Sequence, residues 1–174
     1  MKAYGGRVGV RLLALLAVSA GFASVVAPPA SAGTVGVAGV QSGPVSSAVC
    51  TDQTPGLLAY SMAGGLIGCW YTDTFNSKYQ PTSGTFQATG TEHFVGCLDL
   101  DGDQACTGRD PQGTLYFTFQ FTGKLNPVTL AEVHGRCQHP IISGTGDFAN
   151  ASGVITFKDD VTNGTSLYTG HVAI

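Results

Sequence analysis

Charged residues are scarce in this chain, and basic ones are the scarcest. Only 11% of its 174 residues are charged, with 8 Lys and Arg against 11 Asp and Glu. Attraction between basic side chains and phosphates is the main source of non-specific nucleic-acid binding. We therefore expect no nucleic-acid partner and no attraction to anionic membrane surfaces.

Recognisable catalytic motifs are also missing. The sequence contains no G-x-S-x-G, H-E-x-x-H or C-x-x-C pattern, and these are the spacings that place a nucleophile or a pair of metal ligands. Its four histidines are scattered, so only the fold can bring them together into a zinc site. The sequence thus assigns no reaction class.

A long apolar run occurs only near the N-terminus. A basic region with Lys2, Arg7 and Arg11 precedes apolar residues 12–26, and Ala30-Ser31-Ala32 then matches a signal-peptidase site. An uncleaved membrane anchor is the alternative, but the run is short for a span of ~20 residues. We expect residues 1–32 to be a signal peptide, the protein to be secreted, and no membrane association after cleavage. Five basic and eleven acidic residues remain after the cut, a net charge of −6.

All five cysteines follow the expected cleavage site, which makes disulfides probable in an exported chain. The sequence alone does not fix their pairing. We expect Cys97–Cys106 first, because it closes a compact loop, and Cys50–Cys69 second. Cys137 then remains as a free thiol.

The rest of the chain is a succession of strand-like segments without a helical pattern. The clearest is residues 113–125, where Leu115, Phe117, Phe119 and Phe121 alternate with polar residues. Asn163-Gly164 is typical of a type I′ hairpin turn. The pattern predicts an all-β fold, a single antiparallel β-barrel of about eight strands over residues 56–174. Residues 33–55, rich in Gly and Ser, are expected to be a flexible N-terminal segment.

The stretch SGTGDFANASG, residues 143–153, admits two interpretations. Its glycines suggest a phosphate-binding loop, which needs a following helix, but the residues that follow, Val154-Ile155-Thr156-Phe157, read as a strand. We therefore predict a tight corner between two strands. Gly144 and Gly146 are expected to adopt backbone angles closed to other residues, and Phe148 to plug the barrel end.

The same corner resembles a known motif. The pattern G-x-G-x-F-x-x-A-x-G, from Gly144 to Gly153, resembles the corner motif of the allene oxide cyclase and dirigent superfamily. Residues 90–106 and 113–119 are similar to secreted actinobacterial proteins with an allene oxide cyclase-like barrel domain. The resemblance covers roughly residues 56–174. It implies a calycin-like barrel of eight antiparallel strands, a homo-oligomer that is a trimer as in plant members, and an isomerase or cyclase activity, without assigning a catalytic residue.

Glu92 is the candidate catalytic residue. It alternates in register with Phe86 and Phe94, so it is expected to point into the barrel. Burial disfavours the charged form of a carboxyl group, so Glu92 can act there as a proton carrier or as an anchor for a ligand.

A set of ligand-binding candidates is placed around Glu92. His134 and Arg136 share one face of their strand with Glu132, and they can meet Glu92 if that face is internal. The alternative, which the pattern favours for this strand, is that they form its wet outer face. The complete set of expected ligand-binding residues is Trp70, Phe94, Tyr116, His134, Arg136 and Tyr168.

A second constellation is acidic. Asp99, Asp101 and Asp103 alternate around Gly102, a spacing that can supply several of the oxygen ligands that Ca²⁺ requires. No helix flanks them, so a solvated acidic turn closed by Cys97–Cys106 is the favoured alternative. Calcium is the one cofactor the sequence suggests.

Three functions remain open at this stage. The abundance of phenylalanine favours a binding module for a small apolar ligand. The resemblance favours an isomerase or cyclase that holds a reactive intermediate in one shape. A structural extracellular protein without a small ligand is the third.

Overall fold

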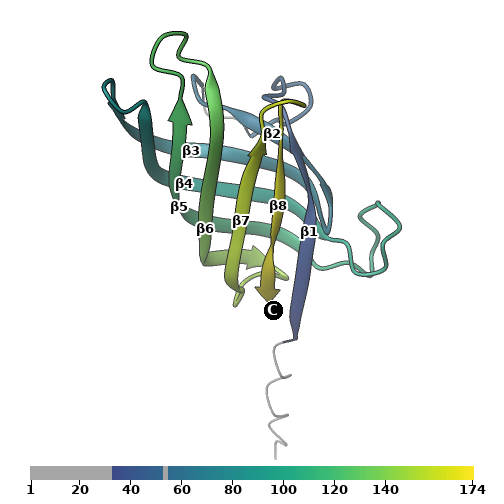
Figure 1. Cartoon of the computed structure of the whole chain (residues 1–174). Helices are drawn as coiled ribbons and strands as arrows, with labels where there is room; N and C mark the ends of the chain where they lie inside the picture. Colours follow the sequence, from purple (N-terminus) through teal and green to yellow (C-terminus); the bar gives the residue numbers. More distant parts are fainter. Residues whose placement is uncertain (1–32, 53–54) are drawn as a thin grey trace, which may run out of the picture. The chain divides into compact units, whose positions relative to one another are not determined.

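The chain folds into a closed β-barrel. The computed structural model describes residues 33–52 and 55–174, so the expected signal peptide lies outside the described residues. Eight strands follow one another around the barrel in chain order, each antiparallel to its neighbours, and β8 pairs with β1 to close the sheet (Figure 1). No helix occurs within the described ranges. The predicted fold class is confirmed.

The strands differ in length, and the four in the middle of the chain are the longest. The bounds are β1 (Thr34–Ser42), β2 (Ala59–Gly64), β3 (Leu66–Gln80), β4 (Thr85–Leu98), β5 (Gln112–Leu125), β6 (Glu132–Gly146), β7 (Ser152–Asp160) and β8 (Thr165–Ala173). Strands β3 to β6 have 14 or 15 residues each, and the other four strands have 6 to 9.

The prediction for the N-terminal segment is wrong in part. Residues 34–42, expected to be flexible, form β1, which bridges β8 and β2. Its small side chains reflect close packing: a Cβ added at Gly39 would collide with the hydroxyl of Tyr168. The pairing with β8 satisfies backbone groups that a sheet edge would leave exposed.

Apolar side chains fill one half of the barrel. Trp70 stacks on Phe117 with ring centroids 4.4 Å apart. Tyr168 is pinned there, since its hydroxyl accepts a hydrogen bond from the Leu66 amide at 2.8 Å. Burial raises the pKa of Tyr168 to about 12. The largest fully buried side chains are Trp70, Tyr168, Phe94, Phe117, Phe148, Leu66, Leu98, Leu115, Ile155 and Val172.

The glycine-rich stretch is the predicted corner between β6 and β7. Phe148 is fully buried and belongs to the core, as expected of a plug. Gly146 has a φ of 62°, in the left-handed region. Gly144 needs no such angle; its requirement is space, because an added Cβ would collide with the Phe148 carbonyl.

The turn between β7 and β8 also differs from its prediction. Four residues, 161–164, connect the strands, and only Gly164 has positive φ, at 65°. Asp160 holds the turn by accepting a hydrogen bond from the Asn163 side-chain amide at 2.7 Å. The longer turn therefore replaces the two-residue type I′ turn that Asn163-Gly164 predicted.

Two disulfides fasten the connections, with the predicted partners. Cys50–Cys69 ties the β1–β2 connection to β3, and Cys97–Cys106 closes the loop between β4 and β5. Cys137 is a buried free cysteine. None of the described residues forms a helix long and apolar enough to span a membrane.

Candidate functional site

One end of the barrel is hollow. A cavity of about 600 Å³ lies at the end that carries the β1–β2 and β7–β8 connections. This volume falls in the range of small-molecule sites, about 300–1,000 Å³. The interior thus consists of a packed core at the end closed by Phe148 and a cavity at the other end.

Six aromatic side chains line the cavity. The alternation of β5 aims Phe119 and Phe121 inward, as predicted, and Phe86 of β4 lies 5.9 Å from Phe121 between ring centroids. A register shift in β3 between Thr72 and Thr74 adds a residue. Both Thr72 before the shift and Phe75 after it consequently line the cavity. The aromatic lining is Tyr60, Phe75, Phe86, Phe119, Phe121 and Phe157.

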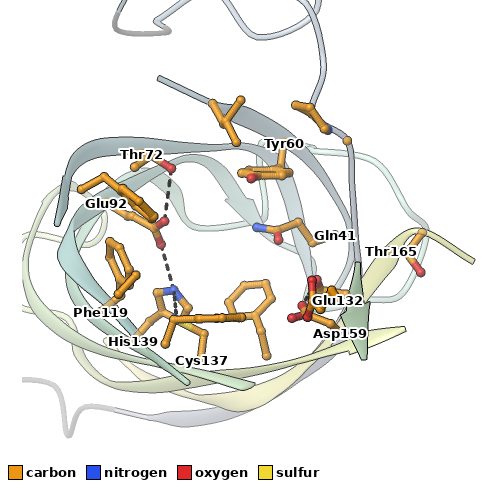
Figure 2. A pocket seen from close by; sticks show the side chains of 18 of the residues that line it. Gln41, Tyr60, Thr72, Glu92, Phe119, Glu132, Cys137, His139, Asp159 and Thr165 are labelled. Atoms are coloured by element: carbon orange, nitrogen blue, oxygen red, sulfur yellow. Dashed lines mark hydrogen bonds and ion pairs between the residues drawn. The ribbon is translucent and has the colours of Figure 1, made fainter. Parts of the chain in front are cut away.

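A group of four residues, the Glu92 cluster, lies on one side of the cavity, where Figure 2 shows Glu92, Thr72 and His139. It consists of Glu92, Trp70, Thr72 and His139. The Trp70 indole N–H donates to Glu92 Oε2 at 2.7 Å, and Thr72 Oγ1 donates to Oε1 at 3.3 Å. His139 Nε2 lies 2.8 Å from Oε2. The carboxylate of Glu92 is therefore held in one orientation by neighbours from β3 and β6, as a positioned acid or base requires.

Cys137 lies beside this cluster without forming a nucleophile–base pair of the usual kind. Its sulfur is 3.3 Å from Nε2 of His139, the same nitrogen that meets Glu92. In a relay the two partners would occupy different ring nitrogens, yet Nδ1 of His139 has no partner among the described residues. Burial, followed by the charges of Glu92 and Asp159, raises the thiol pKa of Cys137 well above its ordinary value, which disfavours the reactive thiolate.

Two carboxyl groups, the acid pair Glu132 and Asp159, lie on the opposite side of the cavity near its open end (Figure 2). A register shift between Lys124 and Leu125 of β5 re-aims Glu132 into the cavity. Ser166 Oγ donates to Asp159 Oδ1 at 2.6 Å. Burial, then the hydrogen bond and charge of Asp159, raises the pKa of Glu132 to about 7.

The predicted ligand-binding residues fall into two groups. Trp70, Phe94 and Tyr168 point inward but lie in the packed core, and of the three only Trp70 bonds to Glu92. Tyr116, His134 and Arg136 are exposed on the outer face of the barrel and cannot meet Glu92. This corrects the assignment of all three as ligand-binding residues, and for His134 and Arg136 it agrees with the favoured alternative, the wet outer face. Cys137 and His139 set the inward face of β6, so the alternate residues His134 and Arg136 face water.

Sequence reasoning placed Glu92 in the barrel but missed its partner. His139 shares the alternation of Cys137 and Ile141, an apolar face that indicates burial. Tyr60 was also missed. It lines the cavity, and burial followed by the charges of Glu92 and Asp159 raises its pKa to about 12.

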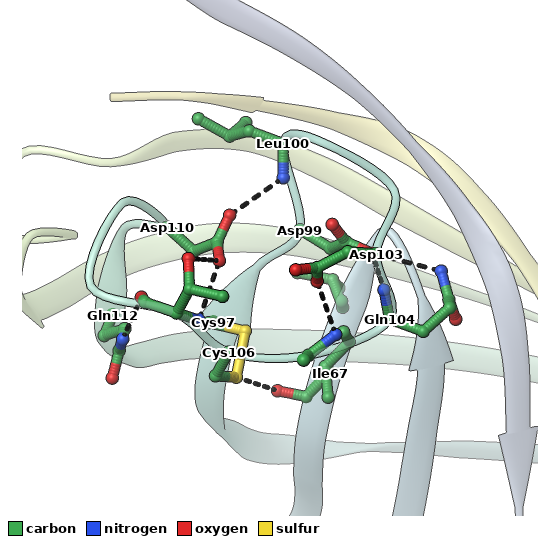
Figure 3. Close-up of a disulfide and its surroundings, with 12 residues drawn as sticks. Ile67, Cys97, Asp99, Leu100, Asp103, Gln104, Cys106, Asp110 and Gln112 are labelled. Carbon is green, nitrogen blue, oxygen red and sulfur yellow. Dashed lines mark hydrogen bonds between the residues drawn. A yellow bond between two sulfur atoms is a disulfide. The ribbon is translucent and has the colours of Figure 1, made fainter.

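The three acidic residues expected to bind calcium form a compact group, here called the aspartate loop (Asp99, Asp101, Asp103). One oxygen from each lies within 4.8 Å of the others. Backbone amides already donate to each carboxylate, including Gly102 N to Asp99 at 2.7 Å. Gln104 also donates to Asp99 (Figure 3). These bonds stabilise an acidic turn whether or not a cation binds, so calcium binding stays a prediction.

Comparison of the chain with protein-family models finds no match, and comparisons with curated proteins and with solved structures find none either.

Proposed function

We propose that this protein is a secreted barrel that binds a small apolar ligand in the cavity. The observation that carries the proposal is the hollow, aromatic-lined half of an otherwise packed barrel. Removal of apolar surface from water contributes roughly 25 cal/mol per Å². A ligand that packs against the aromatic lining gains this free energy for the apolar surface it buries, while the Glu92 cluster can fix its orientation.

Secretion is supported by two independent features. The expected signal peptide precedes the barrel in the sequence. Two disulfides occur in the described residues, and these persist mainly in oxidising compartments. Both favour an extracellular site of action.

An isomerase or cyclase of the allene oxide cyclase-like type is the second candidate, and the contact between Glu92 and His139 favours it. A reactive intermediate held against aromatic walls would be directed by shape and proximity. The Glu92 carboxylate would then carry the proton. With an allene oxide as the probe substrate, Glu92→Gln is expected to lower turnover without weakening binding; unchanged turnover removes this role.

The only tryptophan of the chain provides the test of binding. Trp70 donates to Glu92, which lines the cavity, so a ligand that reaches the Glu92 cluster should alter Trp70 emission. Nile red and 1-decanol are suitable neutral probes. We expect saturable changes in Trp70 emission with both probes, and competition between them.

A matched pair of variants places the binding in the cavity. Ala88 is buried and lines the cavity, whereas its neighbour Thr89 is exposed on the outer face of β4. Ala88→Leu fills part of the cavity and is expected to weaken 1-decanol binding by at least about tenfold. Thr89→Leu adds a similar side chain outside and should leave binding unchanged. Absence of binding to the parent protein would favour a structural protein without a small ligand.

A further inference from the structure

We propose that the ligand of this cavity carries a positively charged nitrogen, held by the acid pair Glu132 and Asp159, at one end of an apolar body. The inference rests on the proposed function and names the class of ligand: an alkylamine or a related organic ammonium.

The acid pair converges on one point of the wall. A Cβ added at Gly135 would collide with Asp159 Oδ2, Glu132 Oε1 and the Phe121 ring. The glycine thus leaves space where two carboxyl groups and an aromatic ring meet. Ammonium groups bind to carboxylates through charge-assisted hydrogen bonds and to ring faces through cation–π attraction.

One oxygen of the pair lacks a partner. Glu132 Oε1 is buried and, when both carboxyl groups are ionised, receives no hydrogen bond from the described residues. Its neighbour Asp159 is a second acceptor, so the partner of this oxygen must be a proton shared by the pair, a water molecule or a donor brought by a ligand. Unsatisfied buried polar atoms are costly. Nδ1 of His139, which is 4% exposed and also lines the cavity, is a second buried atom without a partner.

The charge of the cavity points to the same ligand. Its described lining includes Glu92, Glu132, Asp159 and Asp160, and no lysine or arginine. Burial first, and then the charges of Glu92 and Asp159 together, raise the pKa of the Tyr60 hydroxyl. The negative potential of these carboxyl groups repels an anionic lipophile and attracts a cationic one.

An organic ammonium fits this place better than a metal ion does. Hard cations such as Ca²⁺ need six to eight oxygens, whereas here two carboxyl groups face aromatic rings. In the described residues, the only group of three carboxylates that can gather around a metal is the aspartate loop.

Three probes of one chain length test the proposal: decylamine, 1-decanol and decanoate. Their affinities for the full protein are measured at pH 8 by Trp70 emission and calorimetry. We expect decylamine to bind at least about tenfold more tightly than 1-decanol, the contribution of one charge-assisted hydrogen bond, and decanoate to bind most weakly. In the Glu132→Gln/Asp159→Asn double variant the preference for decylamine over 1-decanol should disappear, with 1-decanol affinity retained. Asp101→Asn, which removes an exposed acid of the aspartate loop, should preserve the preference.

The outcomes separate the two proposals. Binding of 1-decanol without a preference for decylamine, or a preference for decanoate, overturns the ammonium inference and leaves the binding function intact. A preference for decylamine that survives in the double variant overturns the role of the acid pair. If none of the three probes binds, the proposed function itself fails.

Discussion

Replacing Glu132 with Gln is expected to stabilise the protein at pH 8 and to have no effect at pH 4. In the folded protein the pKa of Glu132 is about 7, against an ordinary value of 4.5. Between these pH values the folded state binds more protons than the unfolded state. The free energy of unfolding therefore falls as the pH rises through this window, and the loss is complete above pH 7.

The size of the effect follows from the same shift. Each pKa unit corresponds to about 1.4 kcal/mol, which would give about 3 kcal/mol for a fully enclosed group. Glu132 is only partly buried, so solvent screening reduces the effect to roughly 1 kcal/mol. The corresponding rise in the melting temperature at pH 8 is about 3 °C. Gln keeps the shape of the side chain and removes the charge that faces Asp159.

Urea denaturation followed by Trp70 emission measures this difference at pH 4, 6 and 8. Each variant is compared with the parent protein at the same pH, so the titration of other groups largely cancels. Asp159→Asn should reproduce the gain at pH 8, because it removes the other half of the repulsion, while Asp101→Asn should not. A loss of stability in Glu132→Gln at pH 8, or an equal change at pH 4 and pH 8, would refute the reasoning.

Three further outcomes are expected. Phe148→Ala empties the plug of the barrel and should lower the free energy of unfolding by about 3–5 kcal/mol, measured in urea; a change below about 1 kcal/mol contradicts a plug. The double variant Cys97→Ser/Cys106→Ser opens the loop between these cysteines, which are 9 residues apart, and should lower the free energy of unfolding by about 2–3 kcal/mol in the same assay. An unchanged urea midpoint would contradict this. Millimolar Ca²⁺ should raise the melting temperature if the aspartate loop binds it, and Asp101→Asn should abolish the rise; no shift in the parent protein ends the calcium prediction.

The barrel could be predicted because the alternation of apolar and polar residues along its strands indicates which side chains point inward. Phe117, Phe119 and Phe121 alternate with polar residues, and this pattern alone fixes which side of β5 is buried. β1 could not be predicted in the same way. Its side chains are small because Gly39 must leave space for Tyr168, a contact between segments far apart in the sequence.

The candidate site was only partly predictable for a different reason. Alternation correctly placed Glu92 inside, but it places Glu132 on the same face as His134 and Arg136. The register shift beside Leu125 reverses the direction of Glu132 alone, and it depends on the pairing of β5 with β6. A cavity likewise depends on how far side chains from all strands reach, which no single segment reveals.

Native mass spectrometry of the protein, isolated from the medium into which it is secreted and without added ligand, tests the central claim most directly. The expected spectrum shows a chain cut after Ala32, with two disulfides, carrying a small lipophile that is lost on denaturation. The same spectrum shows whether the chain forms the trimer that the resemblance implies. A ligand-free mass that persists when 1-decanol and decylamine are added in excess would contradict the claim that the cavity is a binding site.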